Sequence, residues 1–292
     1  MAESRSHQGF GPGSGSDSRA GVRRGWRAIL AAESVTELGD EVRGAVLVAG
    51  SHGGLIASYL GAKAGAHALI LNDAGIGLDE AGVAGLPWLD AIGMAAATVS
   101  YTSARIGDGA DSLARGVISR VNAHAARAGV ASGMSARTAA EKLRNAAAPF
   151  AAPPPYAEGR WHVATSSGIE VWALDSVGKL VAEDAGRILL TGSHGALHGG
   201  RRDSALNLHG APVAARAAIF NDAGVGADGV GITRLAELDA RGIPAATVSN
   251  TSARIGDGRS IWQSGVISHV NQRAAERGAR TGMQTSDVVA LM

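Results

Sequence analysis

Continuous apolar segments that each end in a polar, glycine-rich loop recur along the chain. They are apolar at successive positions rather than at alternate ones, which is typical of strands buried on both faces. These segments predict strands in pairs, one member in each half of the sequence: 28–32 and 171–174, 45–49 and 187–191, 68–71 and 217–220, 95–100 and 245–249.

Helical spacing of apolar residues appears between and after these strands. Segments 81–92 and 230–241 are expected to be helices, each closed by the glycine that directly follows it. Segments 116–128 and 265–277 show the same spacing and are also expected to be helical. An alternation of strand and helix predicts parallel sheets covered by helices.

The polar loops themselves are repeated. The repeated motifs are Gly-Ser-His-Gly at 50–53 and 192–195, Asn-Asp-Ala-Gly at 72–75 and 221–224, and Thr-Ser-Ala-Arg-Ile-Gly-Asp-Gly at 102–109 and 251–258. The copies are 142 residues apart at the first motif and 149 apart at the later two, so the second half carries seven additional residues between His194 and Asn221. Identity at loop positions indicates a specified backbone geometry or chemistry. The chain is therefore predicted to be an internally duplicated α/β protein, with two similar parallel-sheet halves packed as a pseudo-dimer.

Alanine- and proline-rich sequence separates the two halves. Residues 151–164, which include three consecutive prolines, are interpreted as a linker between an N-terminal α/β repeat at 25–150 and a C-terminal α/β repeat at 165–292. Residues 1–24 are rich in Gly, Ser and Arg and lack the apolar stretch of a secretory signal. A disordered tail is expected there.

Composition limits the class of protein. Of the 292 residues, 46% are hydrophobic, which is enough for a sizeable core, and a net charge of +1 gives no long-range field that would favour nucleic acid. No apolar run is long enough to cross a bilayer, so no membrane partner is expected. The absence of cysteine excludes disulfides, thiolate metal sites and a thiol nucleophile, and a cytoplasmic location is expected.

Each repeated motif closely follows a predicted strand. Because loops at the carboxyl ends of parallel strands line the ligand crevice of open sheets, the motifs are expected to meet at one edge of each sheet. A Gly-Ser-His-Gly turn before a helix presents backbone N–H groups that suit an anion or an oxyanion. The candidate residues of this loop are Ser51, His52, Gly53 and Gly54, with Ser193, His194 and Gly195 in the second copy.

Serine and histidine in this loop have two interpretations. Ser51 and Ser193 are candidate nucleophiles or donors, and His52 and His194 are candidate general bases. Alternatively, the serines cap helices and the histidines pack and bond a backbone carbonyl. Adjacent residues seldom act on each other, so catalytic partners are expected from different loops.

The second loop adds an amide and a carboxylate at the same edge, as Asn72 and Asp73 and again as Asn221 and Asp222. The aspartates are candidates for orienting the histidines or for ligating a divalent cation. The alternative is an Asx turn, which Asn-Asp-Ala-Gly fits well and which is the preferred interpretation for the asparagines.

The third loop contributes arginine and serine. Arg105 and Arg254 are candidate clamps for a substrate carboxylate or phosphate, because a guanidinium binds such groups through two donors. In the alternative interpretation, each arginine forms an ion pair with a nearby aspartate and braces the loops. Ser103 and Ser252 are assigned to substrate binding beside them.

Other motifs give little support for a cofactor. The Gly-x-Gly-x-x-Gly spacing at 224–229 matches a dinucleotide fingerprint, yet the first copy has Glu80 in place of the third glycine. No spaced zinc signature is present, and we expect neither a cofactor nor a resident metal. His198 and His209 belong to the segment with the insertion and are expected to be solvated.

Ser, His, Asp and Arg on converging loops favour a cofactor-independent enzyme. Its expected substrate is a small polar, anionic carbonyl or carboxylate compound. Amide or ester hydrolysis is the first reaction class, and proton transfer as a lyase or isomerase is the second. The alternatives are a bilobed small-molecule binding or sensor protein and a structural assembly protein. Differences between the copies, such as Tyr101 opposite Asn250, favour one competent or composite site, and a homo-oligomer is left open.

Overall fold

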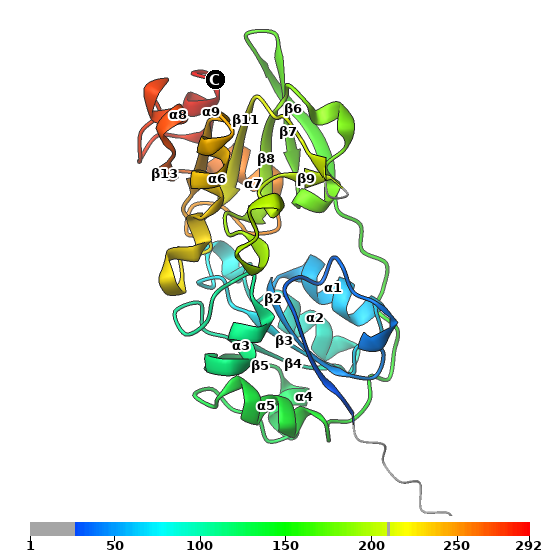
Figure 1. Ribbon diagram of the computed structural model, residues 1–292. Helices are drawn as coiled ribbons and strands as arrows, with labels where there is room; N and C mark the ends of the chain where they lie inside the picture. The colour runs from blue at the N-terminus through cyan, green and yellow to red at the C-terminus, as the bar shows by residue number, and fades with distance from the viewer. Residues whose placement is uncertain (1–26, 209–210) are drawn as a thin grey trace, which may run out of the picture.

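A computed structural model describes residues 27–208 and 211–292 of the chain, so the tail expected at 1–24 lies outside the described residues, as does His209. The described part is a mixed α/β structure with two mostly parallel sheets, and Figure 1 shows them in two lobes, one above the other. The expected α/β class is thus confirmed. No helix in this part is both long and apolar enough to span a membrane.

The first sheet has five strands in the order β1-β2-β3-β4-β5. The first four strands are parallel and β5 is antiparallel to β4. The strands are β1 (Ile29–Ala32), β2 (Val46–His52), β3 (Ala68–Asn72), β4 (Ala95–Val99) and β5 (Ile118–Val121). Every residue of β2, β3 and β4 is buried, as the continuous apolar segments predict.

Helices cover both faces of the first sheet. Leu47 and Leu69 pack with Leu89 on one face, whereas Val46 and Ile70 on the other face belong to the core that includes Leu143. The helices of this half are α1 (Leu55–Lys63), α2 (Gly85–Ala91), α3 (Gly109–Arg115), α4 (Ala123–Arg127) and α5 (Ala136–Leu143).

The second sheet has six strands in the order β13-β12-β11-β8-β7-β6, with β6 and β13 antiparallel to their neighbours. The strands are β6 (Arg160–Ser166), β7 (Ile169–Leu174), β8 (Ile188–His194), β11 (Ala217–Asn221), β12 (Ala245–Val248) and β13 (Ile267–Val270), with a separate hairpin of β9 (Asn207–Leu208) and β10 (Ala211–Pro212). The helices are α6 (Arg234–Ala240), α7 (Gly258–Ser264), α8 (Gln272–Glu276) and α9 (Thr285–Val289). Short 3-10 helices span Asp40–Val42, Leu78–Glu80, Val177–Lys179, Ala182–Asp184, His198–Gly200, Arg202–Ser204 and Ala227–Ile232.

Two predicted helices are wrong. Segments 116–128 and 265–277 each contain an antiparallel strand, β5 or β13, followed by a helix of five residues, α4 or α8. In the first segment the side chain of Asn122 accepts the N–H of Ala125 at 2.9 Å and the N–H of Ala96 at 3.0 Å. Asn122 therefore starts a new helix and fastens the chain to β4, so tertiary contacts override the helical spacing.

The loops at the carboxyl ends of the two sheets meet where the lobes touch (Figure 1). The side-chain amide of Asn250 donates to the carbonyls of Ala74 and Gly75, both at 3.2 Å. Backbone bonds run in both directions, from Leu78 N–H to Asn250 O at 2.8 Å and from Ala227 N–H to Tyr101 O at 2.7 Å. An apolar cluster at this junction includes Ala74, Ala81, Ile106, Ala196, Ala223 and Ile255.

Candidate functional site

The serines of the first repeated loop fasten neighbouring backbone. The Ser51 hydroxyl accepts the N–H of Val35 at 3.0 Å, and the Ser193 hydroxyl accepts the N–H of Val177 at the same distance. Both serines are buried. Each hydroxyl thus links the end of its strand to the loop after the adjacent strand, and neither is hydrogen-bonded to a histidine.

The histidines of this loop are buried and neutral. Nδ1 of His52 accepts the N–H of Gly54 at 3.1 Å, and Nδ1 of His194 accepts the N–H of Ala196 at 3.2 Å. Burial lowers the pKa of His52 to about 4, and burial together with nearby basic groups lowers the pKa of His194 well below its usual range. Since Nδ1 is an acceptor, Nε2 carries the proton. In this environment each histidine is better suited to donate a hydrogen bond than to act as a base that titrates near neutrality.

The glycines of this loop are required by close backbone packing. The Gly53 N–H donates to Asn72 O at 2.7 Å, and the Gly195 N–H donates to Asn221 O at 2.8 Å. A Cβ at Gly53 would come within 2.7 Å of Gly82 O. Gly54 is the N-cap residue of α1, which has no side-chain cap. The first-turn N–H groups of α1 are therefore left for other acceptors.

The asparagines form Asx turns, as the preferred interpretation expects. The Asn72 side-chain oxygen accepts the N–H of Ala74 at 2.9 Å, and its amide donates to Ala104 O at 3.2 Å. Asn221 makes the equivalent bonds to Ala223 and Ala253, both at 2.9 Å. Buried asparagine here joins the second and third loops of each half.

The aspartates also bind backbone. Asp73 Oδ1 accepts the N–H groups of Gly75 at 3.1 Å and Tyr101 at 2.8 Å. Asp222 Oδ1 accepts those of Gly224 and Asn250, both at 2.9 Å. The structure gives neither aspartate a hydrogen bond to His52 or His194. Among the described residues, no three His, Asp or Glu side chains are grouped to hold a metal ion.

The third loop is braced in the same manner. The Ser103 hydroxyl donates to Ser100 O at 2.8 Å and accepts the N–H of Val117 at 2.9 Å. Ser252 makes the equivalent bonds to Ser249 and Val266 at the same distances. Both serines therefore hold the start of the antiparallel edge strand.

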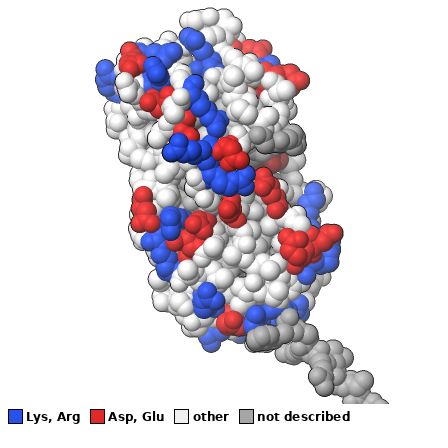
Figure 2. All heavy atoms as spheres, viewed as in Figure 1, with Lys and Arg blue, Asp and Glu red and all other residues white. Residues whose placement is uncertain are grey.

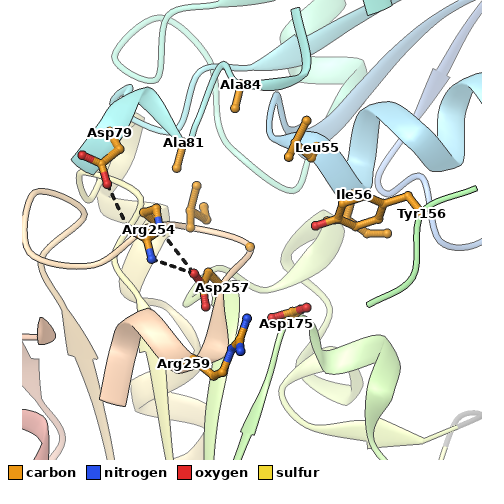
Figure 3. Close-up of a pocket in the computed structure, with 12 residues that line it drawn as sticks. Leu55, Ile56, Asp79, Ala81, Ala84, Tyr156, Asp175, Arg254, Asp257 and Arg259 are labelled. Atoms are coloured by element: carbon orange, nitrogen blue, oxygen red, sulfur yellow. Dashed lines mark hydrogen bonds and ion pairs between the residues drawn. The ribbon is translucent and has the colours of Figure 1, made fainter. Parts of the chain in front are cut away.

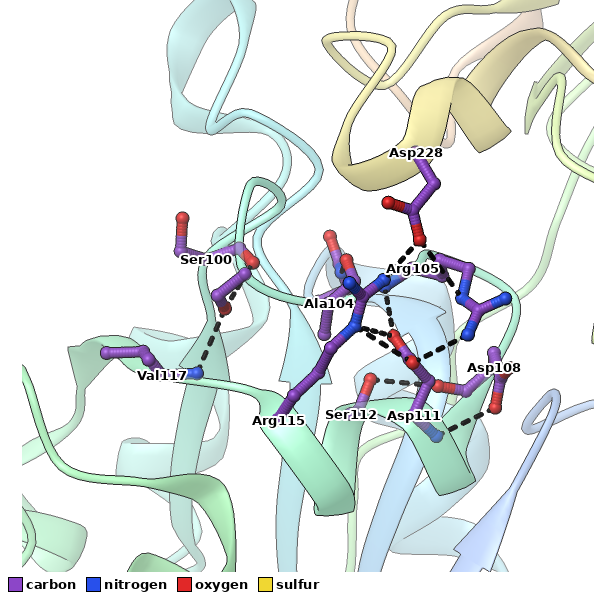
Figure 4. A network of polar contacts seen from close by, with 11 residues as sticks. Ser100, Ala104, Arg105, Asp108, Asp111, Ser112, Arg115, Val117 and Asp228 are labelled. Carbon is purple, nitrogen blue, oxygen red and sulfur yellow. Dashed lines mark hydrogen bonds and ion pairs between the residues drawn. The ribbon is translucent and has the colours of Figure 1, made fainter.

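Arg105 and Arg254 belong to ion pairs that cross between the halves. Figure 4 shows Arg105 and Arg115 around Asp111, at 2.9 and 2.8 Å, with Arg115 also 2.6 Å from Asp228 of the other half. Burial opposes ionisation of Asp111, but the two guanidinium groups outweigh it and lower the pKa of this carboxyl to about 2. Arg254 pairs with Asp79 of the other half at 2.9 Å and with Asp257 at 3.0 Å. These pairs brace the junction.

A pocket of about 230 Å³ opens at the junction beside Arg254 (Figure 3). The first half contributes the first turn of α1, Leu55 and Ile56, together with the Asp79 loop. The segment between the halves contributes Tyr156. The second half contributes Asp175 after β7, Arg254 and Asp257 from the third loop, and Arg259 of α7.

Asp175 is the carboxyl best placed for proton transfer in this pocket. It is 7% exposed and accepts the N–H groups of Gly159 at 2.8 Å and Gly258 at 3.2 Å. Burial raises its pKa, although these two bonds and the nearby Arg259 act in the opposite direction. Burial and the charge of Asp175 also raise the pKa of Tyr156, whose hydroxyl points into the pocket in Figure 3.

Arg259 supplies positive charge at the same place. Its guanidinium stacks 4.1 Å from the ring of Trp161 in β6 and lies beside Asp175 in Figure 3. Stacking on an aromatic face fixes the orientation of the guanidinium while leaving its N–H edge free to bind. Arg259 and the N-terminus of α1 thus provide donors for an anion from opposite halves.

The equivalent position on the other side of the junction has a different lining. Here the loop after β8 lies against the third loop of the first half, and the Gly199 N–H donates to Gly107 O at 2.8 Å. A Cβ at Gly199 would overlap the Glu33 carboxylate, which occupies the position equivalent to Asp175. The segment with the seven-residue insertion therefore gives this side a different surface from the side that holds the pocket.

Sequence reasoning missed the main polar groups of the pocket. Arg254 is a candidate from the sequence and lines the pocket, but Asp175, Tyr156 and Arg259 are not among the candidates. A signal was present, because Arg259 is opposite Ala110 in the alignment of the halves and differs between them. His198, expected to be solvated, instead lies with its ring 5.3 Å from that of His194.

No protein-family model, curated protein or solved structure matches the chain. Function is therefore inferred from the residues and the pocket alone.

Proposed function

We propose that the chain is a cofactor-independent enzyme acting on a small anionic carbonyl or carboxylate compound in the pocket between its halves. The observation that carries this proposal is Asp175, a buried carboxyl with a raised pKa in a pocket that also presents Arg259 and the N-terminus of α1. Perturbed carboxyls in clefts are characteristic of acid–base sites. A volume of about 230 Å³ suits a substrate of a few carbon atoms.

The geometry favours proton transfer over hydrolysis by a serine nucleophile. Ser51 and Ser193 accept backbone N–H groups and do not line the pocket. In the proposed step the Asp175 carboxylate removes a proton from the carbon next to a carbonyl or carboxylate group. The electron pair of that C–H bond moves into the carbonyl, and Arg259 with the first-turn N–H groups of α1 stabilises the resulting oxyanion. Return of the proton to a different face, or loss of a leaving group, completes an isomerase or lyase reaction.

The repeated residues have a supporting role in this proposal. His52, through its bond to Gly54, fixes the turn from which α1 starts, and its ring contacts the third loop of the other half near Gly256. The motifs thus hold the two sets of loops against each other. We further propose that the halves arose by internal duplication and pack as a pseudo-dimer, which explains why the same bonds occur in both.

A binding or sensor protein is the second candidate. It is favoured by the ion pairs of Arg254 with Asp79 and Asp257, which link the lobes at the edge of the pocket without any chemical step. Such a protein would bind the anion and leave it unchanged.

Incubation of the full chain with a defined mixture of small keto, hydroxy and dicarboxylic acids separates the candidates. Chiral chromatography with detection by mass spectrometry, which also separates isomers of equal mass, is expected to show loss of one acid and appearance of its product with the wild type but not with Asp175→Asn. Asp203→Asn, a change at an exposed carboxyl, is the matched control and should retain turnover. Saturable binding of an acid without turnover would favour the sensor instead.

A further inference from the structure

A buried arginine outside the pocket has an incomplete set of partners. Arg234, the first residue of α6, has an exposed fraction of 0%. Its Nη1 donates to the carbonyl oxygens of Ser204 and Ala205, whereas Nε and Nη2 have no hydrogen-bond partner. No carboxylate of the described residues forms an ion pair with it. Buried charges in proteins are normally paired, so this arrangement indicates a missing anion.

The side chains that interact with Arg234 are aromatic or basic. Its guanidinium lies over the ring of Phe220 at 5.5 Å. Burial lowers the pKa of Arg234 to about 9, and the charge of Arg241 adds to this effect. Burial also lowers the pKa values of His194 and His198, and the Arg234 charge lowers both further. The Arg234 N–H donates to Gly195 O at 2.8 Å, directly after His194, and the rings of His194 and His198 lie 5.3 Å apart. Two imidazoles and a guanidinium therefore lie in one region without an ion-paired carboxylate among the described residues.

This arrangement belongs to the second half only. The equivalent of Arg234 in the first half is Gly85, where a Cβ would overlap Ser58 of α1. In the second half the segment with the seven-residue insertion replaces α1, and its carbonyls at Ser204 and Ala205 hold the arginine. The arginine and the insertion thus form one structural unit.

We propose that Arg234, His194 and His198 form a binding site for an oxyanion, the carboxylate or phosphate group of a small ligand, beneath this segment. Nε–H and Nη2–H lie on one edge of a guanidinium and together bind two oxygens, which is the arrangement that carboxylates and phosphates accept. Nε2–H of His194 adds a neutral donor, because Nδ1 already accepts the Ala196 N–H. This site is separate from the proposed substrate pocket and does not depend on it.

Access comes from a groove between the halves. His198 and Ser204 line this groove, which has a volume of about 750 Å³. Glu33 and Glu37 line it as well, and the positive charge of Arg201 acts on both of them. Ser204, whose carbonyl oxygen binds Arg234, connects this groove to the proposed site, so His198 and Ser204 mark the side from which an anion would enter.

Isothermal titration of the full chain with inorganic phosphate and, separately, with acetate tests the site. Saturable binding of at least one of them is expected in the wild type, with affinity at least tenfold weaker in Arg234→Met. Arg202→Met removes the same charge from a side chain that is 85% exposed and is expected to bind as the wild type does. Tighter binding of phosphate would identify a phosphoryl ligand, and tighter binding of acetate a carboxylate.

A second variant covers the case in which Arg234→Met fails to fold. His198→Ala keeps the buried arginine and removes one donor, and we expect affinity to fall by about tenfold, the effect of one hydrogen bond to a charged group. The proposal is overturned if neither anion binds the wild type, or if both Arg234→Met and His198→Ala bind with unchanged affinity.

Discussion

At the scale of single residues, most of the repeated polar side chains bind backbone. Ser51 and Asp73 each accept a main-chain N–H from a neighbouring loop, and Asn72 accepts one from its own loop. Such bonds explain why these residues are identical in the two halves without any reaction at those positions. The pocket residues to which the proposed reaction is assigned, Asp175 and Arg259, differ between the halves. In our proposal the chemical step therefore depends on these asymmetric residues rather than on the repeated ones.

Burial of His52 predicts a loss of stability in acid. Its pKa falls from 6.5 in the unfolded chain to about 4 in the folded one, so the unfolded chain binds the proton more tightly. The free energy of unfolding therefore keeps its full value above pH 6.5. It falls by about 3 kcal/mol in total as the pH is lowered toward 4. Denaturant unfolding of wild type and His52→Gln across this range checks it. The variant should show a shallower pH dependence, whereas His162→Gln, at an exposed histidine, should leave it unchanged. An equally steep dependence in His52→Gln would contradict the burial effect.

The sequence located the loops of the site but not its chemical groups. Ser51, His52 and Asp73 could be found because identical polar residues recur. Asp175 could not be assigned a role, because its raised pKa depends on burial in the folded chain, which the sequence does not show. The backbone groups that bond it, at Gly159 and Gly258, are distant in the sequence.

At the scale of elements, buried strands were predictable and short helices were not. Strands such as β2 and β3 begin with continuous apolar residues that are buried on both faces, and this pattern predicts a strand directly. The segments at 116–128 and 265–277 mixed strand and helix because a side-chain cap in the middle, Asn122 in the first, divides them. Helix α3 was missed because its start depends on the Asp108 side chain accepting the Asp111 N–H.

The close approach of α1 and α2 gives a prediction at this scale. A Cβ at Gly85 would overlap the Ser58 hydroxyl, and overpacking of a core costs about 1–3 kcal/mol. We therefore expect Gly85→Ala to lower the free energy of unfolding by that amount in denaturant titrations. Adding Ser58→Gly to the same chain should recover part of the loss relative to Ser58→Gly alone. Equal effects of Gly85→Ala in both backgrounds would show that the two helices do not limit each other.

At the scale of the whole molecule, the two halves hold each other through their loop edges. Asn250 is 7% exposed and donates to two carbonyls of the first half. Together with the ion pairs of Arg115 and Arg254, it closes the junction around the pocket. Figure 2 shows acidic and basic side chains gathered together at the waist between the lobes, as a charge-paired junction requires.

Removal of the Asn250 amide tests this coupling. Asn250→Ala leaves the carbonyls of Ala74 and Gly75 without their donor, so the free energy of unfolding should fall by about 1–3 kcal/mol. Calorimetry should show a lower melting temperature than in Asn145→Ala, which changes an exposed asparagine. If the two variants have the same melting temperature, the junction does not contribute to stability through this residue.

Deuterium exchange tests the central claim most directly, namely that Asp175 transfers a proton in the pocket between the halves. Small keto, hydroxy and dicarboxylic acids are incubated with the full chain in D2O, and loss of the proton next to the carbonyl or carboxylate group is followed by NMR. The wild type is expected to exchange that proton in at least one acid. In Asp175→Asn the exchange rate should fall by roughly 100-fold or more, since general acid–base groups contribute at least this much. Exchange at the wild-type rate in a folded Asp175→Asn variant, or no exchange in any acid, would contradict the account.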